Sequence, residues 1–460
     1  MLDRILGSGS VRSVTIGGVT ALMVYVAGAG LTACSQFLIA RLVGAETFGV
    51  YSYVLAWVTV LAYFSALGFD IALLRFVSAY RVSRSWGLLR GVIRYAERRT
   101  MIVGALTVLV GATAITLSTD RITTELRDTF LAGFVLVPIW ALIWIRSSIV
   151  RAFGGVISAV APDRVVRDSA LICILLFLAW QLKWELDASL IMMATVASAA
   201  IALLLTSIAV RRIPLPKMDD VVPTYDAALW RKTILPLMAI AAAESAFNRS
   251  GVLVLGWIES NRDAGIYALI FSISFLVALP RTAANTLLAP TIADLFIRRQ
   301  HHSLQVLTAR IAVWTLCGAT ASALALTVIA EPFLTWFGHG YEAGIPALHI
   351  LLVGQVIAAS FGSQLSIMTM TGCERMAALL LIVSALFSLL LSALLVNPLG
   401  LAGAAISTTI SLIVWNVAMA VAIWYRMRLV PSPIFVLQSI FRTNPAAHSS
   451  DKNVPFHRTR

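Results

Sequence analysis

The sequence predicts an all-α polytopic membrane protein, and its composition, its apolar runs and the placement of its basic residues support that prediction. Of 460 residues, 59% are hydrophobic and only 12% are charged, and the mean hydropathy is +0.89. A soluble domain carries about 25% charged residues. The chain is therefore expected to fold in a bilayer.

Apolar runs of helical length recur along the chain and are separated by polar breaks. About 20 residues cross a bilayer, so the longer helices are expected to tilt or to project into the interface. We expect twelve transmembrane helices, at residues 14–40, 47–80, 100–118, 129–150, 163–182, 188–210, 233–258, 264–296, 311–330, 344–371, 377–396 and 400–425.

The basic residues predict how these helices are oriented. The chain has 35 Lys and Arg against 22 Asp and Glu, a net charge of +13. Lys and Arg accumulate in the cytoplasmic loops of membrane proteins, so this excess indicates topology rather than a nucleic-acid partner. With both termini cytoplasmic, most bases fall inside, where they attract anionic membrane lipids. The outer loops then hold only Arg41, Arg121, Arg127, Lys183 and Arg262.

An internal repeat suggests two six-helix halves of the same orientation. Gly49 and Tyr51 correspond to Gly265 and Tyr267 at nearly the same offset that relates Gly154 to Gly372. Chance is the alternative, because Gly and Tyr are common at helix ends. The proline-rich segment "RRIPLPKMDDVVPTYD" is the natural linker between the halves. The expected domains are an N-lobe at 1–212, a linker at 213–226, a C-lobe at 227–428 and a cytoplasmic tail at 429–460.

Nothing in the cysteines or histidines points to a bound group. The four cysteines lack paired spacing, and no pair of histidines has the context of a metal site. No metal and no cofactor is therefore expected.

Three segments resemble bacterial polysaccharide-biosynthesis flippases of the multidrug/oligosaccharidyl-lipid/polysaccharide (MOP) exporter superfamily. They are "LVGAETFGVYS" between the first two helices, "LGFDIALLRFVSAY" closing the second, and "DAGIYALIFSIS" opening the eighth. The resemblance extends over nearly all of the chain except the tail.

The resemblance implies two lobes around a central cavity, in a multi-pass protein of the bacterial cytoplasmic (inner) membrane. It implies a flippase that moves undecaprenyl-pyrophosphate-linked oligosaccharide to the outer leaflet by alternating access, for O-antigen or exopolysaccharide synthesis. The lipid-linked oligosaccharide would be the main partner and the polysaccharide polymerase machinery a further one. Other branches of the superfamily export drugs, so a multidrug antiporter is the alternative.

Charges deep in the predicted helices are the candidate substrate-binding residues. A charge at a helix centre costs at least about 2.5–3.5 kcal/mol, so it is retained for a reason. Pyrophosphate favours Arg, whose planar fork makes paired hydrogen bonds. Two consecutive helices place such groups at similar depth, and Pro280 is expected to kink the second. The candidates are Glu244, Asn248, Arg249, Arg281 and Asn285.

Two other interpretations of these charges stay open. Glu244 could neutralise one arginine as a structural ion pair inside the bundle. It could also couple transport to protons, because burial raises the pKa of a carboxylate. The coupling ion, proton or sodium, is not identified by the sequence.

A second group of charges lies toward the cytoplasmic side and is expected to form a gate. In the helix 47–80, Asp70 lies roughly 10 Å and Arg75 roughly 17 Å from the centre, at 1.5 Å per residue. Arg164, Arg167 and Asp168 occupy the first turns of the fifth helix. Ordinary anchoring at the interface is the alternative role for all five residues.

An enzyme, such as a polysaccharide polymerase or ligase, is the least favoured class. Such chemistry on the outer face needs a sizeable outer loop, and the longest clear one is Thr119 to Asp128. We also find no catalytic carboxylate pair and no Ser/His/Asp set.

The topology is testable by labelling single cysteines introduced into a chain whose native cysteines are replaced. A cysteine at Ser85 should react only when the reagent reaches the cytoplasm, and one at Thr123 should react from outside. The reverse pattern would overturn the predicted orientation.

Overall fold

Helices make up all the regular structure in the described part of the chain. The computed structural model describes residues 8–118, 122–181, 185–213, 221–258, 260–338 and 340–429. The side chains of residues 8–22, 25, 283, 285–290 and 293 are outside this description. Most of the expected linker, 214–220, and the tail from residue 430 onward are also outside it.

The helical elements alternate with short connections, and three 3-10 or π segments (η) interrupt them. Eight helical segments among the described residues are long and apolar enough to cross a membrane, which fits the expected polytopic membrane protein. In chain order the elements are α1 Ser8–Ala66, α2 Phe69–Val82, α3 Trp86–Leu117, α4 Thr124–Ala152, α5 Val156–Ala161, η3 Pro162–Val166, α6 Arg167–Trp180, α7 Ala188–Arg211, α8 Ala227–Ile258, α9 Asn261–Phe275, η5 Leu276–Ala278, α10 Leu279–Ile297, α11 His301–Phe337, η6 Tyr341–Gly344, α12 Ile345–Ala359, α13 Gln364–Met370 and α14 Glu374–Met427.

The two longest elements each join two expected helices across a bend. α1 bends at Gly44, where φ is 76°, and α14 bends at Gly400, where φ is 53°. A residue with a Cβ rarely adopts a positive φ, whereas glycine does so readily. The bends therefore fall where the sequence supplies glycine.

One expected helix, 47–80, is not continuous. The chain leaves the helical conformation at Leu67 and Gly68, with φ of 55° and 75°. A Cβ at Gly68 would lie 2.6 Å from the carbonyl oxygen of Ile234 and from the amide nitrogen of Met238. The break thus lets the backbone of α8 approach, a tertiary requirement that hydropathy does not register.

The expected kink at Pro280 takes the form of a 3-10 turn. This turn, Leu276–Ala278, ends α9, and Pro280 occupies the first turn of α10. Proline is tolerated there because its missing N–H would have no helical partner. The expected helix 264–296 is therefore two helices meeting at a turn.

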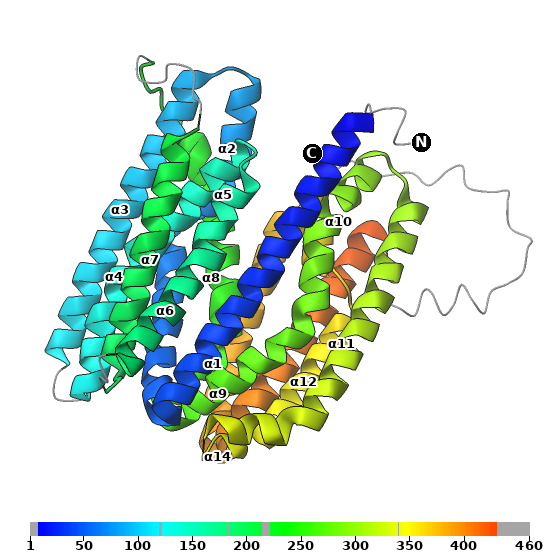
Figure 1. Cartoon of the computed structure of the whole chain (residues 1–460). Coiled ribbons are helices and arrows are strands. Elements are labelled where there is room, and N and C mark those ends of the chain that lie inside the picture. The colour runs from blue at the N-terminus through cyan, green and yellow to red at the C-terminus, as the bar shows by residue number, and fades with distance from the viewer. Residues whose placement is uncertain are drawn as a thin grey trace, which may run out of the picture.

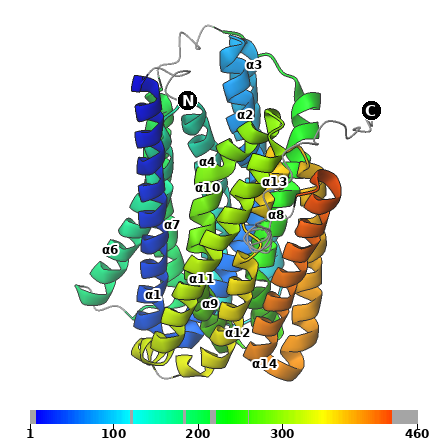
Figure 2. The same cartoon turned by 90° about the vertical axis from the view of Figure 1, so that its right-hand side faces the viewer.

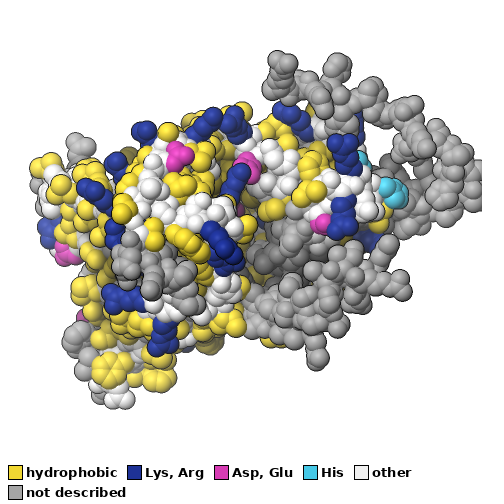
Figure 3. Space-filling view, turned by 90° about the horizontal axis from the view of Figure 1, so that it is seen from above, with side chains coloured by type: hydrophobic (Ala, Val, Ile, Leu, Met, Phe, Trp, Pro, Cys, Tyr) yellow, Lys and Arg dark blue, Asp and Glu magenta, His cyan; other side chains and the backbone are white. Residues whose placement is uncertain are grey.

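Figure 1 shows α2 to α7 gathered on one side and α10 to α14 on the other, with the first part of α1 between them. Turned by 90°, the long helices run side by side along one direction (Figure 2). Figure 3 looks onto one end of the bundle, where Lys and Arg outnumber Asp and Glu. We call this the basic end. The connections from α2 to α3 and from α10 to α11 lie there (Figure 1), and Arg84 and Arg298 are exposed in them. The far end is the opposite one, where α1 and α14 bend.

The two sides share one hydrophobic core toward the far end. A single cluster there joins Tyr51 and Ala199 to Tyr267 and Leu348. Toward the basic end the core divides, into a cluster of α2, α3, α4 and the first turns of α8, and a cluster of α10, α11, α13 and α14. The core is therefore continuous toward the far end and divided into clusters toward the basic end, where the first turns of α8 pack on α2.

Contacts between α1 and the α11–η6 region close the far end. The guanidinium of Arg41 donates to the carbonyl oxygen of Trp336, and its cation lies 5.2 Å from the Trp336 ring centroid. The hydroxyl of Tyr341 donates to the carbonyl oxygen of Ala40 at 3.2 Å. Phe37 packs edge-on against Phe333, with ring centroids 5.6 Å apart.

The residues of the internal repeat occupy matching environments. A Cβ at Gly49 would overlap the carbonyl oxygen of Asn261, and one at Gly265 would overlap that of Ala45. Two residues after these glycines, two buried tyrosines reach threonine hydroxyls. The Tyr51 and Thr195 hydroxyl oxygens are 3.2 Å apart, and those of Tyr267 and Thr408 are 2.8 Å apart. The sequence repeat therefore corresponds to a structural one.

The contact between α1 and α9 makes a stability prediction. Gly49→Ala forces the two backbones apart and should destabilise the protein by about 1–3 kcal/mol, as overpacking does. Gly30→Ala, on the same helix but with no atom within 4 Å of the added Cβ, is the matched control. Thermal unfolding in one detergent compares them, and equal midpoints for the two variants would contradict the close-contact argument.

Candidate functional site

The candidate site is built around α8, which spans the two sides of the molecule. α8 packs against α14 on one side and against α1 and α2 on the other. Ser250 and Phe247 fix it to α14, through a 2.8 Å separation of the Ser250 and Ser388 hydroxyls and a ring contact with Trp415 at 5.5 Å. The polar residues of α8 are thereby held at the junction between the sides.

Glu244 and Arg249 leave α8 on different faces, because five residues advance a helix well past one full turn. Glu244 interacts electrostatically with Arg281, near the start of α10. Arg249 lies instead within electrostatic range of Tyr63 and Tyr51 on α1. Both arginines are half-buried, and no carboxylate among the described residues pairs directly with either. Among the described residues, Glu244 therefore makes no ion-pair contact within 4 Å of either arginine, although its charge still acts on that of Arg281.

Tyr63 is the point where the two predicted groups of charges meet. Its hydroxyl lies within electrostatic range of Glu244 and Arg249 from the candidate substrate-binding set, and of Asp70 and Arg164 from the expected gate. The sequence predicted that these two groups lie at different depths along their helices. The break after α1 and the π segment η3 bring them toward the same tyrosine.

A small cavity of about 130 Å³ opens beside Tyr63. Two of its lining groups, Asp70 Oδ1 and Arg151 Nε, are buried and have no hydrogen-bond partner among the described residues. Buried polar atoms are usually paired, so such orphans mark a place where water or a ligand completes the bonding. The lining residues are Tyr63, Asp70, Trp144, Ser147, Arg151, Ala159, Val160, Asp163 and Arg164.

A row of aromatic rings leads away from this cavity. Tyr63 stacks on Trp144 with centroids 4.3 Å apart, and Trp144 stacks on Trp140 at 6.2 Å. The guanidinium of Arg167 lies 5.7 Å from the Trp140 ring centroid and ends the row. Such rings offer apolar faces, while the Tyr63 hydroxyl and the Trp144 side chain border a polar space.

Arg167 and Asp168 are held in a buried polar network. Arg167 donates to Asp163 at 2.9 Å and to Asp168 at 3.0 Å, and the hydroxyl of Thr32 donates to Asp168. The Arg167 and Asp168 side chains are 14% and 5% exposed, whereas Arg164 is 48% exposed and borders the cavity. Of these three expected gate residues, Arg164 alone lines the cavity, and Arg167 and Asp168 fix α6 to α1.

The other predicted site residues differ in whether they line the cavity beside Tyr63. Asp70 lines the cavity, but Arg75 is exposed on α2 and is not part of its lining. Asn248 is half-buried on α8, one turn from Glu244. The side chain of Asn285 lies outside the described residues.

Four residues of the site were missed from the sequence: Tyr63, Trp144, Arg151 and Asp163. Two spacings could have found some of them. Asp163 and Arg167 are four residues apart, as are Trp140 and Trp144, and residues four apart share a helical face. Tyr63 and Arg151 carry no such signal, because only tertiary packing brings them together.

Solved transporters share this architecture. The chain is similar to the inward-facing conformation of a multidrug resistance MATE family transporter of the MOP superfamily, with a TM-score of 0.69 and 15% identity over 92% of this chain and 99% of that one. It is similar to the outward-facing conformation of such a transporter, with a TM-score of 0.66 and 15% identity over 92% and 96%. A mutant MATE transporter of Vibrio cholerae gives 0.61 and 13% over 91% and 98%. The fold is thus that of a multi-pass membrane transporter.

The family is shown by sequence. The family model described as "Polysaccharide biosynthesis protein" matches residues 15–296, well over half of the chain. The chain belongs to this family, as the motifs in the first two helices implied. A search of curated proteins found no match. The family thus comes from the sequence, and the fold from the likeness to solved membrane transporters.

The buried network around Asp168 makes a testable prediction. Asp168→Ala removes the acceptor for Thr32 and leaves Arg167 half-paired, which should destabilise the protein by about 3 kcal/mol. Asp294→Ala breaks a pair with Arg298 whose side chains are 55% and 54% exposed, and should cost less than about 0.5 kcal/mol. Thermal unfolding of the purified variants measures both, and a neutral Asp168→Ala would show that the network does not hold α6.

Proposed function

We propose that this chain is a flippase for undecaprenyl-pyrophosphate-linked oligosaccharide, moving it from the cytoplasmic to the outer leaflet for O-antigen or exopolysaccharide synthesis. One observation carries the proposal. Arg249 and Arg281 are half-buried at the junction of the two sides and lack direct carboxylate partners among the described residues. Glu244 offsets part of the charge of Arg281, whereas the groups that act on Arg249 are tyrosines. A guanidinium is costly in such a place unless an anion binds there during the transport cycle.

The aromatic row and the polar cavity suit the rest of such a cargo. Tyr63, at the cavity end of the aromatic row, can pack on a sugar ring, and the orphaned atoms of Asp70 and Arg151 can bond sugar hydroxyls. The lipid tail would remain in the bilayer, outside the protein. Groups of the protein therefore match the pyrophosphate and the sugars of the cargo.

We also propose the architecture that this function requires. Twelve helices form an N-lobe at 1–212 and a C-lobe at 227–428 around a central cavity, joined by the linker 213–226 and followed by a tail at 429–460. The repeat at Gly49 and Gly265 supports the two lobes. The basic end would face the cytoplasm of a bacterium, across its inner membrane.

Alternating access is the transport mechanism within this proposal. The shared core and the Arg41 and Tyr341 contacts join the two sides at the far end. Toward the basic end the core is split into two clusters, and the start of α8 packs in one of them. Such an arrangement suits a state that accepts cargo from the cytoplasmic side. Release would require the far end to part and the basic end to join.

Drug export is the second candidate, favoured by the likeness of the fold to multidrug transporters. The charge of the site separates the two functions. Many drugs are cations, and Arg249 and Arg281 would repel them, whereas Glu244 supplies one compensating charge. A strain expressing the protein should therefore gain no resistance to cationic dyes if the flippase assignment is correct.

The site arginines are tested by transport in cells that depend on this protein. Arg249→Ala and Arg281→Ala should each lower oligosaccharide export at least about tenfold, since a hydrogen bond to a charged group contributes about 1.5–3 kcal/mol. Arg310→Ala, an exposed arginine on α11, is the control. Lipid-linked oligosaccharide should accumulate in the inner leaflet of the deficient strains. Normal export by the Arg249→Ala/Arg281→Ala double variant, at equal protein level, would contradict the proposal that these two arginines bind the cargo.

A further inference from the structure

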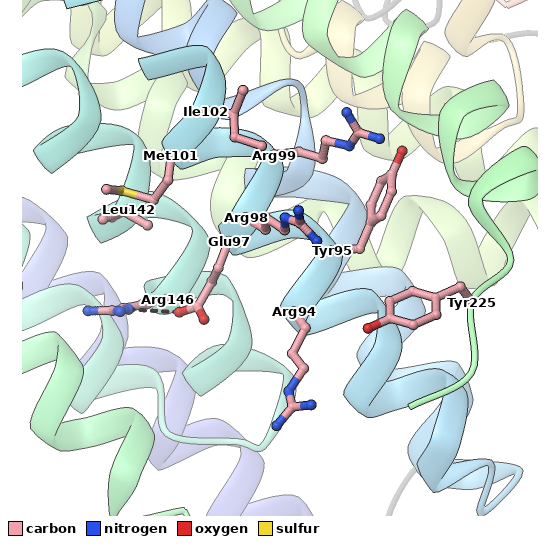
Figure 4. Close-up of a pocket in the computed structure, with 10 residues that line it drawn as sticks. All are labelled: Arg94, Tyr95, Glu97, Arg98, Arg99, Met101, Ile102, Leu142, Arg146 and Tyr225. Atoms are coloured by element: carbon pink, nitrogen blue, oxygen red, sulfur yellow. Dashed lines mark hydrogen bonds and ion pairs between the residues drawn. The ribbon is translucent and has the colours of Figure 1, made fainter. Parts of the chain in front are cut away.

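A second cavity lies on the side of the bundle near the basic end. Its volume is about 760 Å³, and it shares no lining residue with the cavity beside Tyr63. Figure 4 shows its walls, formed by one stretch of α3, the facing part of α4 and the segment before α8. The proposed transport does not use this cavity.

Arginines dominate its polar lining. Arg94, Arg98 and Arg99 are exposed, and no carboxylate among the described residues forms an ion pair with them. The one acid of the lining, Glu97, is engaged by Arg146 at 3.0 Å. The cavity therefore presents three uncompensated positive charges within a turn and a half of one helix.

Two features hold this basic wall in place. Arg146 is fixed from both sides, by Glu97 and by the hydroxyl of Ser207 at 2.5 Å. Tyr95 and Tyr225 both pack on the buried Trp230, with centroids 5.3 Å and 6.3 Å away, and Arg99 lies over the Tyr95 ring at 5.3 Å. A basic pocket with a rigid aromatic wall is preorganised for an anion.

The other side of the pocket is apolar and opens onto the membrane face of α3. Met101 and Ile102 line the cavity and are 46% and 41% exposed. The apolar surface continues along α3 through the exposed Leu106, Leu109 and Val110. A free phosphate or a nucleotide would make no favourable contact with this apolar surface, whereas acyl chains would pack against it.

We propose that this pocket binds the headgroup of an anionic membrane phospholipid, with its acyl chains along the exposed face of α3. Basic pockets between membrane helices favour lipid headgroups with more than one phosphate. Three arginines without an acidic partner among the described residues match a two-phosphate headgroup better than a single phosphate. Diphosphatidylglycerol is therefore expected to bind more tightly than phosphatidylglycerol, and both more tightly than phosphatidylcholine.

Native mass spectrometry of the delipidated full-length protein, titrated with each of these three lipids, tests the site. Wild-type protein should bind diphosphatidylglycerol at least about tenfold more tightly than phosphatidylcholine, and Arg94→Ala/Arg98→Ala should lose at least about tenfold of that affinity. Arg231→Ala/Arg426→Ala removes two exposed arginines from the same end but outside the pocket, and should change it less than about twofold.

Three results would overturn the proposal. An equal loss in both double variants would mean diffuse attraction to a basic surface. Unchanged binding by Arg94→Ala/Arg98→Ala would place the lipid elsewhere. Displacement of the lipid by inorganic pyrophosphate at micromolar concentration would show a site for the phosphate alone. Matching unfolding midpoints in lipid-free detergent confirm that the variants are folded.

Discussion

The close approach of Gly49 and Gly265 is the constraint on which the rest of the structure depends. Without side chains at these positions, α1 and α9 meet backbone to backbone. Tyr51 and Tyr267 follow two residues later, so both are drawn into the shared core and reach their threonines. The two sides are thereby fixed to each other at the far end.

The arginines near the site fall into two kinds that the sequence does not distinguish. Arg167 has two carboxylates and a tryptophan ring around it, so its charge is already compensated and it helps to hold α6 in place. Arg249 and Arg281 have no direct carboxylate partner among the described residues. The first kind supports the fold and the second is suited to an anion. A charged residue in a membrane helix is therefore a candidate for a binding site. Whether a carboxylate contacts it in the folded protein indicates if it supports the fold or is suited to a ligand.

Much of the fold was predictable from the sequence, because bilayer crossing imposes length and hydropathy on each helix and Gly49 and Gly265 recur at a fixed offset. The break at Leu67 and Gly68 was not, since it exists to admit the backbone of α8. The charged residues of α8 and α10 were predictable from depth alone. Tyr63 and Arg151 were not, because uncharged or helix-end residues become part of a site only when distant helices pack together.

The contacts that close the far end rest on main-chain acceptors. Arg41 and Tyr341 donate to the carbonyl oxygens of Trp336 and Ala40, which every residue type supplies. A substitution at position 40 keeps the backbone carbonyl oxygen, so the acceptor of this hydrogen bond does not depend on the side chain there. The hydrogen bonds of this closure therefore depend on the identity of the donors Arg41 and Tyr341 and not on that of the acceptor residues.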